Sequence, residues 1–182
     1  MNAPQAPINS FLGRKFDQIC FVVRDLEQAM DYWRATNGVT AWNVAEGLAR
    51  EQSGKEYRGK PGDFQFSCAY GYAGETLIEL ARHDGGASVY GDWLEERGPG
   101  LHHIGFRQDS EEEYRLAEAH YLSLGIEKAM AGLFEGPFGN CRWAYFDTRA
   151  QLGCYTELYY VDGEIAERME RLKRGENVSI TS

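Results

Sequence analysis

The strongest constraint on the fold of this chain is an internal duplication. Residues 17–21, with the sequence Asp-Gln-Ile-Cys-Phe, precede one predicted helix, and residues 102–106, with the sequence His-His-Ile-Gly-Phe, precede another. A repeat of this kind indicates that one supersecondary unit is used twice and that the two copies bury a shared core. The chain is therefore expected to place two similar modules side by side.

Each predicted helix begins with a capping pair. The pair is Asp25 and Gln28 in the first copy, and Ser110 and Glu113 in the second. An apolar stripe at helical spacing follows each pair, and a glycine ends each stripe. A side-chain oxygen at the cap position accepts a free backbone N–H group of the first turn, and glycine suits the turn that ends a helix. The two copies therefore predict equivalent helices.

Each copy also closes on a predicted strand that carries a glutamate before a leucine, at residues 77–80 and 155–158. Glu79 follows Gln18 by 61 residues and Glu157 follows His103 by 54, so the first copy is about seven residues longer. The excess is assigned to the polar stretch 46–62. Residues 88–96 predict a short helix that links the copies, and a C-terminal helix with one narrow apolar face is suited to packing on the body or on another subunit.

Alternation along these strands predicts which side chains face inward. On each first strand the apolar residues occupy one face, which packs beneath the helix, so Gln18 and His103 face the opposite, concave side. His102, beside His103, is expected to face outward. The same alternation turns Glu79 and Glu157 inward on the last strands. Two facing modules would then bring together four polar side chains.

These four side chains form a plausible ligand set for a metal. Two carboxylates, one amide oxygen and one imidazole suit a six-coordinate divalent ion with two open positions, where oxygens of a substrate would bind. Taken singly, each residue would more often be an ordinary surface or core polar group. Their recurrence at equivalent positions of two copies is the argument for Gln18, Glu79, His103 and Glu157 as metal ligands.

Composition excludes several other classes of protein. The chain has 182 residues, of which 43% are hydrophobic, and a formal net charge of −9, which disfavours nucleic acid as a partner. The longest apolar runs fall far short of the roughly 20 residues of a membrane span. The first 15 residues lack the pattern of a secretory signal, and no Cys-x-x-Cys pair occurs, so four buried free thiols and a cytoplasmic location are expected.

The pattern resembles the vicinal oxygen chelate superfamily, which includes glyoxalase I, methylmalonyl-CoA epimerase, extradiol dioxygenases and the bleomycin- and fosfomycin-resistance proteins. The resemblance covers residues 14–161. It is carried by residues 16–19 with 23–26, by 77–80, by 100–106 and by 145–148 leading to Glu157. The Gly-Leu-His-His-Ile segment is most similar to the epimerase branch, whereas the ligand order Gln, Glu, His, Glu is similar to that of eukaryotic-type glyoxalase I.

The resemblance implies an α+β fold in which two tandem βαβββ modules form a curved, half-barrel mixed sheet around a central metal site. The corresponding division of the chain is a 1–13 arm, a first module at 14–84, a linking helix and turn at 85–99, a second module at 100–161, and a C-terminal helix and tail at 162–182. A homodimer is also expected from the resemblance.

The implied activity is metal-dependent proton transfer next to a metal-bound carbonyl, by an isomerase, epimerase or lyase of the glyoxalase type. One divalent ion, Zn, Ni, Co, Mn or Fe, would be bound. Glu157 is the first choice for the base, with Glu79 as a ligand and possible second base, and these roles are exchangeable. Gln18, where many relatives have histidine, argues against an iron extradiol dioxygenase, whose facial triad needs two histidines and one carboxylate.

Two alternatives stay open: a lyase or ring-cleaving enzyme of aromatic or steroid breakdown, and a metal-free protein that binds a small drug-like molecule. Aromatic residues flank the proposed site in excess, which favours a bulky or aromatic small-molecule substrate. Arg107 and Arg142 are candidates for contacting a carboxylate or phosphate of that substrate. The aromatic residues are Phe64, Phe66, Tyr70, Tyr72, Phe134, Phe138, Trp143 and Tyr145.

Overall fold

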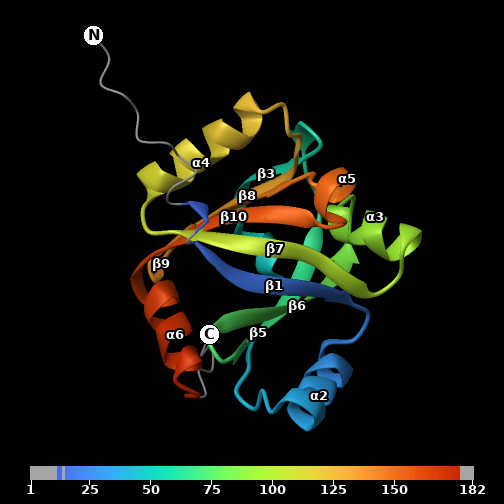
Figure 1. Ribbon diagram of the computed structural model, residues 1–182, viewed down its shortest axis with the longest axis vertical. Helices are drawn as coiled ribbons and strands as arrows, with labels where there is room; N and C mark the ends of the chain where they lie inside the picture. The colour runs from blue at the N-terminus through green and yellow to red at the C-terminus, as the bar shows by residue number, and fades with distance from the viewer. Residues whose placement is uncertain (1–11, 14, 177–182) are drawn as a thin grey trace.

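A computed structural model describes residues 12–13 and 15–176 of the chain (Figure 1). The first half contains β1 (Phe16–Val23), α2 (Leu26–Asn37), β2 (Asn43–Ala45), the 3-10 helix η1 (Leu48–Glu51), β3 (Ser53–Tyr57), β4 (Lys60–Pro61), β5 (Gln65–Ala73) and β6 (Thr76–Gly85). After α3 (Val89–Glu96), the second half contains β7 (Gly100–Gln108), α4 (Glu111–Ser123), β8 (Lys128–Gly136), β9 (Gly139–Phe146), α5 (Arg149–Leu152), β10 (Tyr155–Val161) and α6 (Gly163–Lys173).

All ten strands join one curled mixed sheet, in the order β2-β5-β6-β1-β7-β10-β9-β8-β3-β4. Each half pairs its first strand in parallel with its last, β1 with β6 and β7 with β10, and the halves meet where β1 and β7 pair antiparallel. The expected α+β fold with a curved half-barrel sheet is therefore confirmed. The proposed N-terminal arm lies almost entirely outside the described residues.

The helices form where the caps predict them. Asp25 Oδ1 accepts the backbone N–H of Gln28 at 3.0 Å at the start of α2, and Ser110 Oγ accepts that of Glu113 at 3.1 Å at the start of α4. Gly38, with φ 70°, follows α2 as the expected left-handed residue. These local hydrogen bonds satisfy backbone groups that a helix end leaves unpaired, which is why both ends could be predicted.

The two outer helices cover the convex face of the sheet. Phe21 and Val23 of β1 pack against α2, and Phe106 of β7 packs in the cluster formed with α4. The opposite faces of the same strands, with Cys20 and Val22, contribute to the largest core cluster. This is the distribution that alternation predicts, and it reserves the concave face for Gln18 and the residues level with it.

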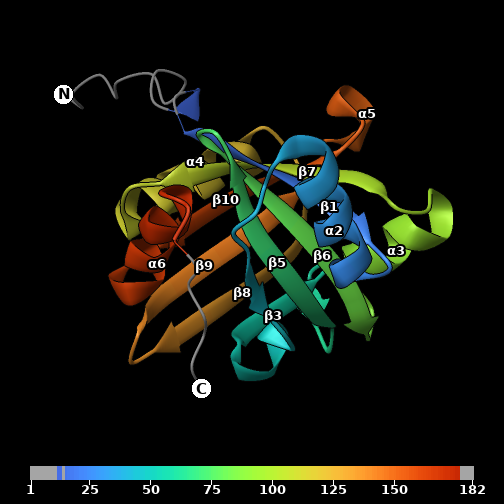
Figure 2. The same cartoon turned by 90° about the horizontal axis from the view of Figure 1, so that it is seen from below.

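Two segments close the concave side of the sheet. In the first of them, β2 pairs with β5, η1 follows, and β3 then pairs with β8. This stretch therefore connects the two outer parts of the sheet. Figure 2 shows this stretch, coloured cyan, between β8 and β5. The longer polar stretch predicted in the first copy is thus used for this crossing. On the other side α6 contacts both β9 and β5, and its Leu172 is buried.

The four cysteines are free, as expected, and Cys141 is the least buried of them. No helix among the described residues is long and apolar enough to span a membrane.

Candidate metal centre

The four residues chosen from the sequence converge on the concave face. Gln18 Nε2 lies 2.7 Å from Glu79 Oε2, 2.7 Å from Glu157 Oε2 and 3.0 Å from His103 Nε2. His103 Nε2 lies 3.2 Å from each of the same carboxylate oxygens. None of the four residues is more than 6% exposed. They come from β1, β6, β7 and β10, which are neighbours at the centre of the sheet.

Strand register explains this convergence. Gly105 of β7 lies opposite both Gln18 of β1 and Glu157 of β10, so these two side chains flank a position without a side chain. A Cβ atom at Gly105 would lie 2.8 Å from Gln18 Cβ, closer than side-chain atoms approach. Two residues further along β1, Cys20 lies opposite Glu79 of β6 on one side and opposite His103 of β7 on the other. The absence of a side chain at Gly105 therefore leaves room for the side-chain amide of Gln18.

The expectation that His102 faces outward is wrong. The register of β1 against β7 pairs Cys20 with His103 and Phe21 with Leu101, so His102 is the extra residue of a β-bulge. A bulge changes the phase of alternation and re-aims one side chain. His102 is consequently 0% exposed, as is His103 beside it.

A hydrogen-bonded chain through His102 fixes the orientation of the His103 ring. His102 Nε2 lies 3.3 Å from the carbonyl oxygen of Val89 in α3, and His102 Nδ1 lies 2.9 Å from His103 Nδ1. Burial and the neighbouring charge of His103 lower the pKa of His102, which keeps it neutral. Because a carbonyl only accepts, His102 donates from Nε2 and accepts at Nδ1 from His103 Nδ1–H. His103 Nε2 then faces the two glutamates: it donates its N–H to them when the ring is protonated, and offers its lone pair to a cation when the ring is neutral.

The cluster keeps two carboxyl groups and an imidazole away from water. Burial raises the pKa of Glu157, and this outweighs the opposing effect of His103. Burial alone would lower the pKa of His103, but Glu157 and Glu79 raise it. When both carboxylates are ionised, their two negative charges exceed the single positive charge that a protonated His103 can offer. Burying an uncompensated charge is costly, and a divalent cation would neutralise it.

The separations between these atoms fit a shared metal ion. Neighbouring ligand atoms of an octahedral ion bound at 2.0–2.2 Å are about 3.0 Å apart, and the separations here are 2.7–3.2 Å. The amide nitrogen of Gln18 has two hydrogens but three acceptors within reach, and an exchange of its oxygen and nitrogen positions would offer Oε1 to a cation. The residues present therefore fit a divalent metal.

Cys20 is an additional potential ligand that the sequence did not single out. Its Sγ, a carboxylate oxygen of Glu79 and a ring nitrogen of His103 all lie within 4.8 Å of one another. Burial and the charge of Glu79 raise the pKa of the Cys20 thiol well above its usual value. Glu157 Oε2 lies 2.7 Å from Gln18 Nε2 and 3.2 Å from His103 Nε2, whereas Cys20 satisfies only the wider limit of 4.8 Å, so Glu157 is favoured over Cys20. Cys20 lies two residues after Gln18 on the same strand, so alternation alone could have suggested it.

Aromatic rings line the inside of the half-barrel next to the cluster. The rings of Tyr145 and His103 have centroids 4.6 Å apart, Trp143 lies 5.1 Å from Tyr145, and the hydroxyls of Tyr90 and Tyr145 are hydrogen-bonded. Of the predicted aromatic set, Phe64, Phe66, Trp143 and Tyr145 are buried in the main core, whereas Phe138 is 49% exposed. These rings shield the cluster from water.

The two arginines proposed for substrate contact lie on different faces. Arg142 forms an ion pair with Glu111 of α4 at 3.1 Å and its guanidinium lies within 5.9 Å of the Tyr114 ring, so it is on the convex side, away from the cluster. The suggestion that Arg142 contacts substrate is therefore wrong. Arg107 lies on the concave face, because residues 103, 105 and 107 of β7 alternate with the convex positions.

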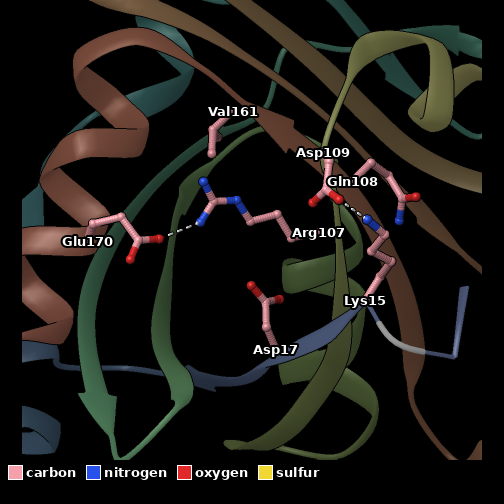
Figure 3. Close-up of a pocket in the computed structure, with 7 residues that line it drawn as sticks. All are labelled: Lys15, Asp17, Arg107, Gln108, Asp109, Val161 and Glu170. Atoms are coloured by element: carbon pink, nitrogen blue, oxygen red, sulfur yellow. Dashed lines mark hydrogen bonds and ion pairs between the residues drawn. The ribbon is translucent and has the colours of Figure 1, made fainter. Parts of the chain in front are cut away.

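A cavity of about 370 Å³ opens at the Arg107 end of this face (Figure 3). Its lining includes Asp17 of β1, Arg107 of β7, Val161 at the end of β10 and Glu170 of α6. Tyr159, which shares a face of β10 with Glu157 and Val161, donates a hydrogen bond to Asp17, 2.8 Å from Oδ2. This bond lies between the cavity and the cluster, and we call the cavity the mouth of the half-barrel.

Residues 17–145 match the family model described as the Glyoxalase/Bleomycin resistance protein/Dioxygenase superfamily. The chain belongs to this superfamily, as the curled sheet and the central cluster of polar residues also indicate. No curated protein sequence matches the chain.

Solved structures with a similar fold include methylmalonyl-CoA epimerases. The enzyme from Mycobacterium tuberculosis is 18% identical, with a TM-score of 0.55 over 92% of this chain and 97% of that one. A variant from Streptomyces coelicolor in complex with 2-nitronate-propionyl-CoA is 19% identical, with a TM-score of 0.53 over 80% and 96%. A hypothetical protein from Bacillus halodurans is 19% identical, with a TM-score of 0.54 over 80% and 93%. At these identities the likeness shows the fold.

Proposed function

We propose that this protein is a metal-dependent enzyme that moves a proton at a carbon next to a carbonyl group, as an epimerase or a glyoxalase-type isomerase. Membership of the superfamily and the epimerase-like neighbours support an enzyme of the vicinal oxygen chelate type. The observation that carries the proposal is the buried convergence of two carboxylates, one amide and one imidazole at separations that suit one divalent ion.

Gln18, Glu79, His103 and Glu157 would hold the cation. The chemistry that it supplies when bound is stabilisation of the negative charge that forms on a carbonyl oxygen as the neighbouring carbon loses a proton. Gln18 and His103 carry no group suited to taking up that proton at neutral pH while they serve as ligands. Their role is to hold the centre in place. The two glutamates are the groups that can exchange a proton with the substrate.

Glu157 is the better candidate for the base. Its carboxylate is buried, which in the metal-free protein raises its pKa, and a carboxylate with a raised pKa that loosens from the cation is a stronger base that can also return the proton. Glu79 lies within 2.7 Å of the same amide nitrogen of Gln18, so the two carboxylates flank one point. An epimerase that works with two bases places one on each face of the reacting carbon, and this pair could serve both faces. An isomerase would need only one of them.

An acyl thioester is the substrate class that we propose. One similar structure is named as methylmalonyl-CoA epimerase in complex with methylmalonyl-CoA and NH4⁺. Its identity of 18% carries the fold to this chain, and the thioester follows as part of our proposal. A thioester carbonyl acidifies the adjacent C–H, which is the chemistry that the paired glutamates could use.

Two measurements test the proposed function together. Protein purified without added chelator should contain close to one divalent ion per chain, determined by elemental analysis. With methylmalonyl-CoA as the probe in deuterated buffer, it should incorporate deuterium at the carbon next to the thioester, detected by NMR. Absence of metal together with absence of exchange would favour the alternative of a metal-free binding protein. Bound metal without exchange on this probe would exclude the thioester and retain the metal centre.

Replacing His102 should weaken metal binding without removing a ligand. In His102→Ala the Nδ1–H group of His103 loses its acceptor, so the ring is free to rotate and to shift its proton. Loss of such a partner typically lowers metal affinity about 10- to 100-fold. His102→Gln, whose side chain can both accept and donate, should recover part of the affinity. Competition with a chelating dye measures the metal affinity of both variants. Unchanged affinity in His102→Ala would show that the hydrogen bonds from His103 through His102 to Val89 are not needed for metal binding.

A further inference from the structure

Arg107 has unused hydrogen-bonding capacity at the mouth of the half-barrel. Figure 3 shows its guanidinium in the middle of the cavity, with Glu170 on one side and Asp17 on another. Within the described residues the guanidinium forms one ion pair, from Nη1 to Glu170 Oε1 at 3.3 Å. A guanidinium presents five N–H donors in a fork that matches a carboxylate or a phosphate. Most of these donors are therefore available to a ligand in the cavity.

Two of the three acidic groups in the cavity lining, Asp17 and Asp109, have polar partners other than Arg107. Both carboxylate oxygens of Asp17 accept from the Tyr159 hydroxyl, at 2.8 and 2.9 Å, and Asp109 pairs with Lys15. Glu170 is 53% exposed, whereas Arg107 is only 23% exposed. An ion pair with so exposed a partner is weak and is screened by salt. Glu170 is thus the partner of Arg107 that an incoming anion can most easily replace.

Glu170 belongs to a helix that covers the mouth. α6 follows β10 directly after Asp162, and the glycine that begins it, Gly163, has a φ of 56°. Near its end, Leu172 packs against Ala41 of the first half. Lys173 pairs with the exposed Glu75. The last turn of α6 is therefore held against the first half by the buried Leu172, which also packs on Tyr70 and Tyr72, and by one ion pair with an exposed glutamate.

The catalytic centre has to be reached from outside, and the side chains of Glu79 and Glu157 are only 5% and 8% exposed. On β7, Arg107 follows His103 by four residues on the same face, about 13 Å from Cα to Cα at the usual strand rise. A molecule that spans this distance could place a carbonyl at the centre and a charged group at Arg107. That geometry suits an extended anion rather than a two-carbon acid.

We propose that Arg107 binds an anionic group of the substrate, a carboxylate or a phosphate, and that this group replaces Glu170 and releases α6 from the mouth. The inference rests on the proposed function, because it places the reacting carbonyl at the cluster of Gln18, Glu79, His103 and Glu157. Arg107 then selects for anionic substrates, and the exchange of partners couples binding to opening of the site.

The binding test uses inorganic phosphate and malonate as probes, titrated by calorimetry into the full chain at low ionic strength. Arg107→Gln should weaken binding of the preferred probe about tenfold or more, since it removes hydrogen bonds to a charged group. Glu170→Gln should tighten binding severalfold, because it removes the competing carboxylate. The matched control is Glu164→Gln, which alters a 54% exposed glutamate of α6 paired with Arg168 and should leave binding unchanged. The tighter probe shows whether the recognised group is a carboxylate or a phosphate.

The movement of α6 has a separate readout. Trypsin should cut at Arg168 or Arg171 faster in Glu170→Gln than in the wild type, and faster in the wild type when the preferred probe is present. Equal probe affinity in Arg107→Gln and wild type, or no binding of either probe to the wild type at millimolar concentration, would overturn the anion site. Unchanged cleavage rates would overturn the release of α6. None of these readouts needs turnover, so their failure is distinguishable from failure of the proposed function, which metal content and deuterium exchange report.

Discussion

Glu157→Gln is expected to fold, to keep the metal centre and to lose turnover by a factor of about 10² to 10⁴, the usual contribution of a positioned general base. The amide keeps the shape of the side chain and an oxygen that can approach a cation, but it cannot take up a proton at neutral pH. The loss should therefore appear in kcat under saturating metal, with a smaller effect on KM. Deuterium exchange next to the thioester measures it directly.

The stereochemistry of exchange separates the roles of the two glutamates. If each glutamate serves one face of the substrate, Glu157→Gln should stop exchange with one enantiomer of the probe and leave slow exchange with the other, while Glu79→Gln should show the reverse preference. Epimerisation should stop in both variants. Glu135→Gln, an exposed glutamate of β8, provides the matched control and should behave as the wild type. Full turnover by Glu157→Gln would remove that residue from the mechanism.

Removal of the metal is expected to lower the melting temperature by about 8–16 °C. Free metal at about 1,000 times its dissociation constant stabilises the folded state by about 4 kcal/mol, and for a chain of this length each kcal/mol corresponds to about 2–4 °C. The apo protein retains two buried carboxylates close together, with only Gln18 and His103 to offset them. Thermal unfolding with and without a chelator, followed by restoration with added metal, measures the shift.

The shift in melting temperature on chelation also shows whether Glu157 or Cys20 completes the metal site. Cys20→Ala should keep the chelator-sensitive shift if the thiol is not a ligand, as the closer approach of Glu157 to Gln18 and His103 favours. Glu157→Leu should lose most of the shift, because leucine cannot contact a cation. The opposite pattern, with the shift lost in Cys20→Ala and kept in Glu157→Leu, would identify Cys20, Glu79 and His103 as the centre. An unaltered melting temperature in the wild type after complete chelation would contradict a stabilising metal.

Local sequence rules account for much of the fold. The caps at Asp25 and Ser110 formed as predicted, because the side chain and the N–H group that it satisfies are only three residues apart. Alternation along each strand assigned the inner face correctly for Gln18 and Glu79, because a strand has a fixed period of two wherever its pairing is regular. The duplication then supplied the long-range information that one strand lacks.

The failures occurred where pairing is irregular or where partners are distant. His102 was assigned to the wrong face because a bulge depends on how β7 pairs with β1, and no local pattern marks it. The segment from β2 to β3, which joins the β5 side of the sheet to β8, was recognised only as extra length, since the sequence does not state which strand β3 pairs with. Arg142 was misplaced for a related reason: its partner Glu111 belongs to a helix that packs on the convex side.

The sequence by itself determined that the chain repeats one module and that each copy turns one amide or imidazole side chain and one glutamate toward the concave side, because periodicity and capping act over short stretches of chain. Only the tertiary structure decided that the four side chains meet within hydrogen-bonding distance, that His102 orients His103, and that Arg107 contacts Glu170 in the helix over the mouth. Those contacts join residues from different strands and helices, and their geometry depends on strand register and on how the sheet curls, which no local pattern specifies.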